Sequence, residues 1–400
     1  MLINSRAENN RHNLRIFAEI VLACAEIECY NSDMYIHELE NWPHFLWDHE
    51  NLSHLLIQLR HEQGRLIGGM KSIGFHMRDE TVLQALTQDV VKSSEIEGEI
   101  LDQSLVRSSV ARHLGMDIAA LDSSDRNIDG VVEMVLDATQ KFDEPLTKER
   151  LLIWHASLFP LARSGFKKIK AGTWRTGPVQ VVSGRMDRET VHFDAPAAER
   201  VDHEMTLFLD WLNNETSMDL VLKAAIAHLW FVTIHPFEDG NGRISRAIAD
   251  LLLARSENSS CRFYSLSAQI QKERKTYYAI LEQTQKESLD ITSWIEWFFS
   301  CLRRAIKEAL FTLDTILQKM HFWEHHTNLS VNERQRKMIN NLLDGFEGKL
   351  TTSKWAKMTK CSQDTAYRDI LDLVDRGILK KNAEGGRNTS YFLLMPEKLL

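Results

Sequence analysis

The chain has 400 residues, enough for two or three domains, and 44% of them are hydrophobic, which supports sizeable buried cores. Its formal net charge of −8 excludes a protein that binds polyanions over its whole surface. The charge is uneven, because residues 331–400 hold 13 Lys and Arg against 9 Asp and Glu. A basic tail on an acidic body is a hint of nucleic-acid contact through that tail.

Cysteine usage and hydropathy indicate the compartment. Five cysteines are scattered without a CxxC pair, which is typical of a reduced compartment rather than of a disulfide framework. No uninterrupted apolar run reaches membrane-spanning length, and Glu19 interrupts the apolar stretch 15–24, which argues against a signal peptide. We therefore expect a cytoplasmic protein with no membrane partner.

The first part of the chain is helical by its apolar spacing. Residues 1–33 differ in character from the rest of the chain and form an N-terminal extension, either an upstream stretch from an early start site or a short extra helix. Apolar residues recurring every three or four positions predict helices at 51–70, 80–93, 101–114, 127–142 and 148–159. Between the second and third of these lies SSEIEGE, residues 93–99, which on its own is typical of a solvated acidic turn.

The stretch 170–196 changes character and carries Gly172, Gly177 and Gly184. Two short extended runs, 179–182 and 190–193, flank a glycine-bearing turn and predict a β-hairpin. Helices at 197–213 and 218–234 follow, and His228 on the second is typical of a satisfied core histidine.

Polar residues then gather at HPFEDGNGRISR, residues 235–246, between two apolar helical runs. Gly240 and Gly242 allow backbone N–H groups to approach an anion closely, and Asn241 tolerates a left-handed conformation between them. The helix that follows directs its free N–H groups and positive dipole end to the same point. This pattern predicts a phosphate site, to which Arg243 and Arg246 add bidentate charge.

Two further residues of this loop suit chemistry on a phosphate. Asp239 supplies a carboxylate for Mg²⁺, which usually binds through one or two carboxylates plus substrate phosphates. His235 is placed to accept a proton from an attacking hydroxyl. The alternative is a glycine-rich helix–loop–helix turn with incidental charges.

The string resembles the signature of Fic-domain proteins, HPFx(D/E)GNGRxxR, and every defined position matches. The resemblance implies an all-α Fic fold with a small β-hairpin flap. It implies transfer of AMP from ATP to a Tyr, Thr or Ser hydroxyl of a target protein or of the chain itself, with His235 as the catalytic base and Asp239 on the metal. The implied nucleotide-binding residues are Phe237, Gly240, Asn241, Gly242, Arg243, Arg246, Tyr277 and Tyr278.

Two earlier stretches gain meaning from this resemblance. Ser93, Glu97 and Gly98 match the inhibitory pattern (S/T)xxxE(G/N) of Fic proteins. There the carboxylate lies against the arginine at position 246 and occupies the space of the ATP γ-phosphate, so that ATP binds in a pose unsuited to in-line attack. The hairpin resembles the flap, in which Val179, Gln180, Val181 and Val182 hold the target by strand addition; the alternative is a plain surface hairpin.

Two helices are expected after the signature, at 273–285 and 292–319. Tyr277 and Tyr278 lie on the first and border the nucleotide base in similar proteins, although a core role for one of them is equally compatible. His321, Glu324, His325 and His326 have helical spacing, and without a fixed partner they are more typical of an exposed helix end than of a metal site.

The tail resembles a winged helix-turn-helix domain, with helices at 331–346, 352–358 and 363–375 and strands at 378–381 and 390–394 around a turn at 384–387. Residues of the expected recognition face are Gln363, Thr365, Tyr367 and Arg368, and candidates for phosphate contact are Lys380, Lys381 and Arg387. Such modules bind DNA, and they also serve in dimerisation or protein binding.

The expected organisation has four parts: an extension at 1–33, an N-terminal helical domain with the inhibitory motif at 34–125, a Fic catalytic domain at 126–320 and a winged-helix domain at 331–400. Two other functions fit the same residues. One is removal of AMP from a modified protein, with Glu97 orienting a water. The other is an ATP-sensing DNA-binding regulator without turnover, against which the intact His235 argues. A homo-dimer is compatible with either.

Overall fold

The computed structural model describes residues 34–116, 125–165, 167–185, 188–286, 288–327, 329–382 and 389–396. The expected extension at 1–33, the turn at 384–387 and the side chain of Arg387 lie outside these ranges. The chain divides into two compact units. Unit 1 holds the described residues up to Gln63 together with Asp79–Ala305, and unit 2 holds Gly64–Arg78 and the chain from Ile306 onward.

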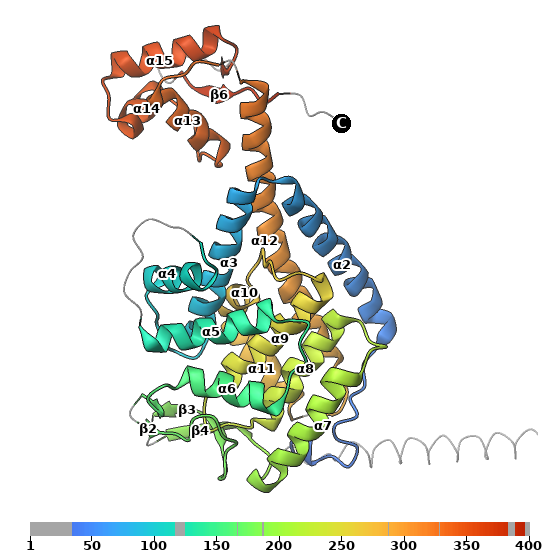
Figure 1. Cartoon of the computed structure of the whole chain (residues 1–400). Coiled ribbons are helices and arrows are strands. Elements are labelled where there is room, and N and C mark those ends of the chain that lie inside the picture. Colours follow the sequence, from blue (N-terminus) through green and yellow to red (C-terminus); the bar gives the residue numbers. More distant parts are fainter. Residues whose placement is uncertain are drawn as a thin grey trace, which may run out of the picture. The chain divides into compact units, whose positions relative to one another are not determined.

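Unit 1 is mostly helical (Figure 1). Its elements are η1 (Ile36–Glu38), α2 (His49–Ser72), α3 (Phe75–Ile96), α4 (Gln103–His113), α5 (Arg126–Gln140), α6 (Lys148–Leu158), β1 (Arg163–Ser164), β2 (Lys167–Lys168), β3 (Gln180–Arg185), β4 (Arg188–Asp194), η2 (Ala198–Arg200), α7 (Val201–Asn214), α8 (Leu220–Ile234), α9 (Asn241–Glu257), α10 (Leu266–Lys272), α11 (Arg274–Thr284) and the first part of α12 (Thr292–His325). Helices α2, α3 and α12 contribute residues to both units.

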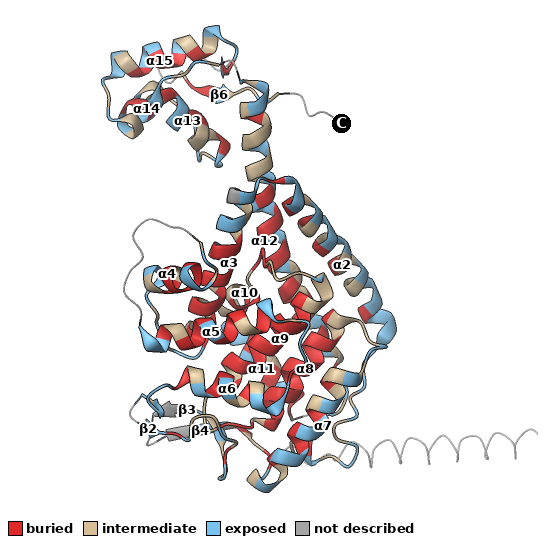
Figure 2. Cartoon of the chain, viewed as in Figure 1, coloured by how far each residue is buried: buried red, intermediate tan, exposed pale blue. Residues whose placement is uncertain are grey.

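Helices α8 and α9 form the centre of unit 1 and pack against each other. Figure 2 shows both as buried along nearly their whole length. A helix that is apolar all round belongs in a core, and α8 reads LVLKAAIAHLWFVTI. The Trp294 indole N–H donates to the Ala225 carbonyl at 2.8 Å, which fixes the first part of α12 against α8. The loop between α8 and α9 is therefore held by two rigid, buried helices.

Helix α3 is anchored to the rest of unit 1 through a buried carboxylate as well as through apolar residues. Asp89 accepts hydrogen bonds from Ser265 Oγ at 2.5 Å and from the Ser267 N–H at 3.3 Å. Burial, with the neighbouring Asp250 carboxylate, raises the pKa of Asp89 to about 8. These contacts fix the position of the C-terminal part of α3 relative to α10.

Some short elements of unit 1 were not expected from the sequence, among them β1, β2 and α10. The ladder β1–β2 has only two residue pairs, and α10 is a single short helix. The β3–β4 hairpin is longer than expected, since Gly184 lies within β3 and pairs with Glu189 rather than forming the turn. All three described sheets are two-stranded and antiparallel.

Unit 2 includes α13 (Glu333–Leu343), α14 (Thr352–Thr359), α15 (Gln363–Asp375), β5 (Leu379–Lys381) and β6 (Tyr391–Leu393). Their apolar core contains Trp355, Ile370 and Leu373, and it also takes in Phe322 from the end of α12. Three helices followed by two paired strands is the order expected for a winged helix, and that assignment stays a prediction. Within the described ranges, no helix is long and apolar enough to cross a membrane.

Candidate active site

The loop between α8 and α9 contains two left-handed residues. His235, at the C-terminal end of α8, has φ 51°, and Gly240, directly before α9, has φ 83°. Asn241, which the sequence placed in a left-handed conformation, instead begins α9. Its side chain accepts from the Phe237 N–H at 3.0 Å and donates to the Phe237 carbonyl at 2.9 Å, so it closes the loop.

Phe237, expected to line the nucleotide site, is fully buried beneath the loop. Its ring stacks on His155 with centroids 4.0 Å apart and contacts Trp174 at 4.8 Å. The Phe237 side chain therefore anchors the loop in the core. The Phe237 backbone, through its hydrogen bonds with Asn241, helps to fix the conformation of the loop.

The N-terminus of α9 has the geometry of an anion site. The first intrahelical bond runs from the Ile244 N–H to the Gly240 carbonyl at 3.0 Å. The three preceding N–H groups, of Asn241, Gly242 and Arg243, consequently have no acceptor within the helix, and the helix dipole adds partial positive charge there. Such a terminus favours a phosphate or a carboxylate.

His235 has the tautomer that a general base requires. Its Nδ1 lies 3.1 Å from the Val232 carbonyl, which can only accept, so Nδ1 carries the proton and Nε2 holds a free lone pair. Surrounding protein lowers the pKa of His235 to about 4, the desolvation being the largest cause. The ring is thus neutral near pH 7 and able to take up a proton at Nε2.

Asp239 offers one carboxylate at the same loop. It accepts from Ser164 Oγ and from the Gly240 N–H. One carboxylate beside an anion site suits Mg²⁺, a hard cation that retains waters and takes its other oxygens from substrate phosphates. Among the described residues, His, Cys, Asp and Glu form no group of three that would hold a metal without a phosphate. The donor set therefore fits a nucleotide-bound Mg²⁺.

An internal carboxylate occupies the anion site. Glu97 Oε1 lies 2.7 Å from Arg246 Nη2, and Ser93 accepts from the same guanidinium through Oγ and its carbonyl, each at 2.9 Å. A Cβ added at Gly242 would meet Glu97 Oε1 at 2.1 Å, so the carboxylate lies directly on the first turn of α9. Gly98 follows with φ 86° and ends α3 there. The ion pair expected from the sequence is therefore present.

A second acid, which the sequence analysis missed, pairs with the other arginine of the signature. Glu99 Oε2 lies 2.7 Å from Arg243 Nη1, and the Arg243 side chain is only 6% exposed. Two acids flank one left-handed glycine, and they meet two arginines one helical turn apart on α9. The only hint in the sequence was that each stretch carries two such charges close together, Glu97 with Glu99 and Arg243 with Arg246.

The two tyrosines of α11 have different surroundings. Tyr277 is buried and its hydroxyl lies 2.9 Å from His228 Nε2. Burial lowers the pKa of His228 to about 3, so the imidazole is neutral and accepts this bond as a core histidine. Tyr278 is 37% exposed and donates to the Ile96 carbonyl of α3 at 3.3 Å. Tyr278 is therefore the one of the pair with ring surface open to a ligand.

The flap is tied to the signature loop by Arg175, which precedes the flap in the sequence. Its guanidinium donates to the carbonyls of His235 at 2.8 Å and Gly177 at 3.0 Å, and also to that of Pro196. These carbonyls belong to the loop and to both ends of the flap. Val179 accepts from the Ala195 N–H at the flap base, and Val182 is 43% exposed on β3.

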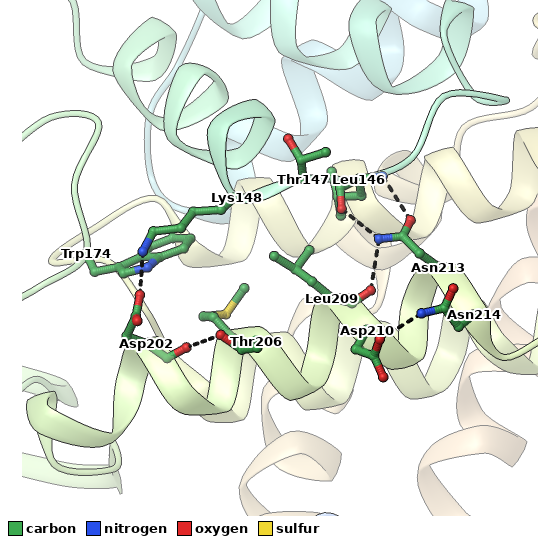
Figure 3. A pocket seen from close by; sticks show the side chains of 11 residues that line it. Leu146, Thr147, Lys148, Trp174, Asp202, Thr206, Leu209, Asp210, Asn213 and Asn214 are labelled. Carbon is green, nitrogen blue, oxygen red and sulfur yellow. Dashed lines mark hydrogen bonds and ion pairs between the residues drawn. The ribbon is translucent and has the colours of Figure 1, made fainter.

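A separate pocket of about 370 Å³ lies between α6 and α7 (Figure 3). Its lining includes Trp174, whose ring rests on Phe237, and an ion pair between Lys148 and Asp202. None of the signature residues lines it. This pocket is therefore distinct from the candidate nucleotide site.

Parts of the chain match known protein families and relatives. Residues 145–253 match the Fic/DOC family, and residues 35–116 match a domain of unknown function, DUF4172. Protein adenylyltransferase Fic from Drosophila willistoni is 26% identical over 242 residues, which cover 59% of this chain and 44% of that protein. Protein adenylyltransferase fic-1 from Caenorhabditis briggsae is 40% identical over 90 residues, 22% of this chain and 16% of that protein.

Among solved structures, a Fic family protein from Desulfovibrio desulfuricans G20 aligns with a TM-score of 0.49 and 20% identity, covering 86% of this chain and 97% of that chain. The chain spans less than half the length of the two adenylyltransferases from Drosophila willistoni and Caenorhabditis briggsae. The Fic/DOC match covers the signature region, residues 145–253, and relates this chain to protein adenylyltransferases.

Proposed function

We propose that this protein transfers AMP from ATP to a Tyr, Thr or Ser hydroxyl of a protein, and that Glu97 holds it in an inhibited state. The observation that carries the proposal is the pairing of two features on one loop. His235 has a free Nε2 lone pair, and the adjoining α9 terminus has unpaired N–H groups flanked by two arginines.

The protein groups have separate tasks in this reaction. The α9 N–H groups and Arg243 bind the phosphates, and Arg246 binds the γ-phosphate once Glu97 has left. His235 Nε2 takes the proton from the attacking hydroxyl, whose oxygen bonds to the α-phosphorus as the bond to pyrophosphate breaks. Asp239 would hold Mg²⁺, which neutralises phosphate charge when bound. Catalysis then comes mostly from positioning and electrostatic stabilisation.

The flap supplies the position of the acceptor. The backbone of β3 near Val182 is available to pair with an extended target segment, with Arg175 keeping the flap at a fixed distance from His235. Hydrogen bonds from the backbone would set the register without selecting a particular sequence. Selection of the target is therefore expected to come from side chains around the flap.

Inhibition follows from where the acids lie. Glu97 covers the first turn of α9 and pairs with Arg246, while Glu99 pairs with Arg243. Both arginines are thus neutralised before a nucleotide arrives, and the site of the γ-phosphate is filled. ATP that binds beside Glu97 would be held away from the in-line pose.

The test is mass spectrometry of the purified chain after incubation with Mg²⁺ and ATP carrying a labelled α-phosphate. We expect AMP on the protein in the Glu97→Gly variant, and none when His235→Ala is added to it, because only the base is removed. ATP binding should persist in the His235→Ala protein. Transfer at the same rate without His235 would contradict the mechanism.

The reverse reaction is distinguished by the same variants. If the protein removes AMP, Glu97 orients the water, so Glu97→Gly would process an AMP-modified protein more slowly than the parent does. If it adds AMP, Glu97→Gly is the faster enzyme. The direction of this one change therefore assigns the role of the carboxylate.

A further inference from the structure

A short basic hairpin adjoins the candidate active site and has no role in the proposed transfer of AMP. It comprises Arg163–Lys170, with β1 and β2 as its strands, and its cations are Arg163, Lys167, Lys168 and Lys170. All four side chains are exposed, whereas Ile169 between them is only 5% exposed and anchors the hairpin in the core. Figure 1 shows β2 at the same end of unit 1 as the flap strands β3 and β4.

The hairpin contacts the signature loop directly. Ser164 Oγ donates to the carboxylate of Asp239, the residue assigned to the metal. Further along, Lys170 Nζ donates to Thr176 Oγ1 at 3.1 Å, next to Arg175 at the flap base. The basic hairpin is therefore bonded to the rim of the site on the Asp239 side and at the base of the flap.

Three of the cations of the hairpin, Arg163, Lys167 and Lys168, have no ion-pair partner among the described residues. Lys148 nearby, by contrast, pairs with Asp202. Arg163 and Lys168 stand directly opposite each other in the β1–β2 ladder. Like charges at opposed positions are destabilising, and no ion pair among the described residues offsets this repulsion.

The nucleotide does not account for these cations. The arginines that suit its phosphates are Arg243 and Arg246, with side chains 6% and 1% exposed, at the α9 terminus. The hairpin cations instead point to solvent, on a protein whose formal net charge is −8. A local positive surface of this kind attracts the acidic segments of a partner and repels basic ones.

We propose that the basic hairpin is a docking surface for acidic side chains of the protein substrate, lying beside the hydroxyl that the flap presents. This inference rests on the proposed function only in naming the partner a substrate. It deepens that function, because backbone pairing at the flap sets register while the hairpin selects sequences with Asp or Glu close to the acceptor.

The first arm of the test measures binding and needs no transfer. The probes are two fluorescein-labelled peptides, Glu-Val-Glu-Thr-Glu-Val and Ser-Val-Ser-Thr-Ser-Val, titrated with the full chain carrying Glu97→Gly. We expect the acidic peptide to bind about ten-fold more tightly in low salt, and the preference to disappear at about 0.5 M salt through screening. The same affinity for both peptides, or no binding of either, would overturn the proposal.

The second arm changes the hairpin. The triple variant Arg163→Ser, Lys167→Ser, Lys168→Ser keeps Ser164 and the Ile169 anchor. It should lose the preference while the ATP affinity stays unchanged, and its melting temperature should not fall, because the opposed like charges are gone. Its control, Lys71→Ser, Lys357→Ser, Lys360→Ser, removes the same charge from exposed sites elsewhere and should keep the preference. A triple variant with weakened ATP binding would show that the hairpin serves the nucleotide instead, and would also overturn the proposal.

If the proposed function is wrong and no AMP is transferred, the peptide titration still tests whether the hairpin binds acidic segments. Where transfer does occur, the triple variant should raise the KM for the acidic peptide and leave kcat and the KM for ATP unchanged. A fall in kcat alone would mean that the hairpin acts on the chemistry through Asp239 and not on docking.

Discussion

A contact with the backbone determines which ring nitrogen of His235 is able to accept a proton. The Val232 carbonyl fixes which nitrogen carries the proton, and the left-handed conformation at φ 51° turns the residue out of α8. Non-glycine residues in this conformation are uncommon and often mark functional sites. The residues of the signature predict that His235 is a base, but only the structure shows which of its ring nitrogens carries the proton.

The pH dependence of transfer should reflect the lowered pKa of His235. Because burial lowers that pKa to about 4, the ring stays neutral and competent down to about pH 5, well below the ordinary value for histidine. The acid limb of kcat/KM for the Glu97→Gly variant, measured with a buffer series, should thus lie near pH 4 or below, since Glu97 itself raises this pKa. An acid limb near pH 6.5 would contradict the environment described for His235.

Removing Glu97 should activate the protein through Arg246. Glu97→Gly frees the guanidinium and the space on α9, so self-labelling should rise about ten-fold or more, which corresponds to about 1.4 kcal/mol of barrier. Adding Arg246→Ala should remove most of that gain, because the freed arginine is its source. Self-labelling is measured by mass spectrometry. A Glu97→Gly protein no more active than its parent would refute the inhibitory role.

At the scale of elements, the C-terminal end of α3 is fixed in place by several contacts along its length. Its position is set by Asp89 against α10, by Tyr278 against the Ile96 carbonyl, and by Ser93 on Arg246. Gly98 then reverses the chain so that Glu97 and Glu99 both face α9. The contact between Glu97 and Arg246 is therefore a property of how the helix docks and not of one residue.

Glu99→Gln should tighten ATP binding without full activation. The change removes the charge that neutralises Arg243 and leaves Glu97 in place. Since Glu99 is 43% exposed, the gain should be modest, about two- to five-fold in ATP affinity by calorimetry. The matched control is Glu95→Gln, an acid of α3 that pairs with Lys92 and not with the signature. Equal effects of the two substitutions would remove Glu99 from the inhibitory contact.

Across the whole molecule, the tail raises a separate question. On α15, Gln363, Tyr367 and Arg368 are exposed, while Thr365 bonds back to the N-cap Ser362; Lys380 and Lys381 are exposed on β5. These positions suit a recognition helix and a phosphate contact, which is the winged-helix proposal. Cutting the chain near residue 328 would uncover Phe322, whose ring belongs to the core of this unit, so point changes are the better test.

If the tail binds DNA, Lys380→Ser with Lys381→Ser should weaken that binding about equally for all sequences. Each lost phosphate contact should reduce the slope of log affinity against log salt by about one unit. Gel shifts over a salt series measure this, with Lys71→Ser plus Lys275→Ser as the control of the same charge. A parent protein that shifts no DNA would leave the tail as a protein-binding or dimerisation module.

Most helices followed from apolar spacing, because α8, α9 and α15 have long faces that must be buried. The ladder β1–β2 could not be predicted, since Arg163, Ser164, Lys167 and Lys168 show no apolar alternation. Likewise, Phe237 was assigned to the nucleotide from its place in the signature, although its ring is core. Contacts between α3 and α9 depend on docking across about 150 positions of sequence, which spacing within either segment does not encode.

Gly242 leaves room on α9 for a carboxylate that belongs to the same chain. Such a competitor has a fixed effective concentration, which dilution of the protein does not lower. If ATP binds this site as proposed, it must displace the carboxylate by mass action, or wait for α3 to open locally. The basal rate of transfer by the parent protein would then depend on the free energy of undocking α3. Substitutions far from the nucleotide, at Asp89 for instance, would change that rate only by changing how stably the helix is docked.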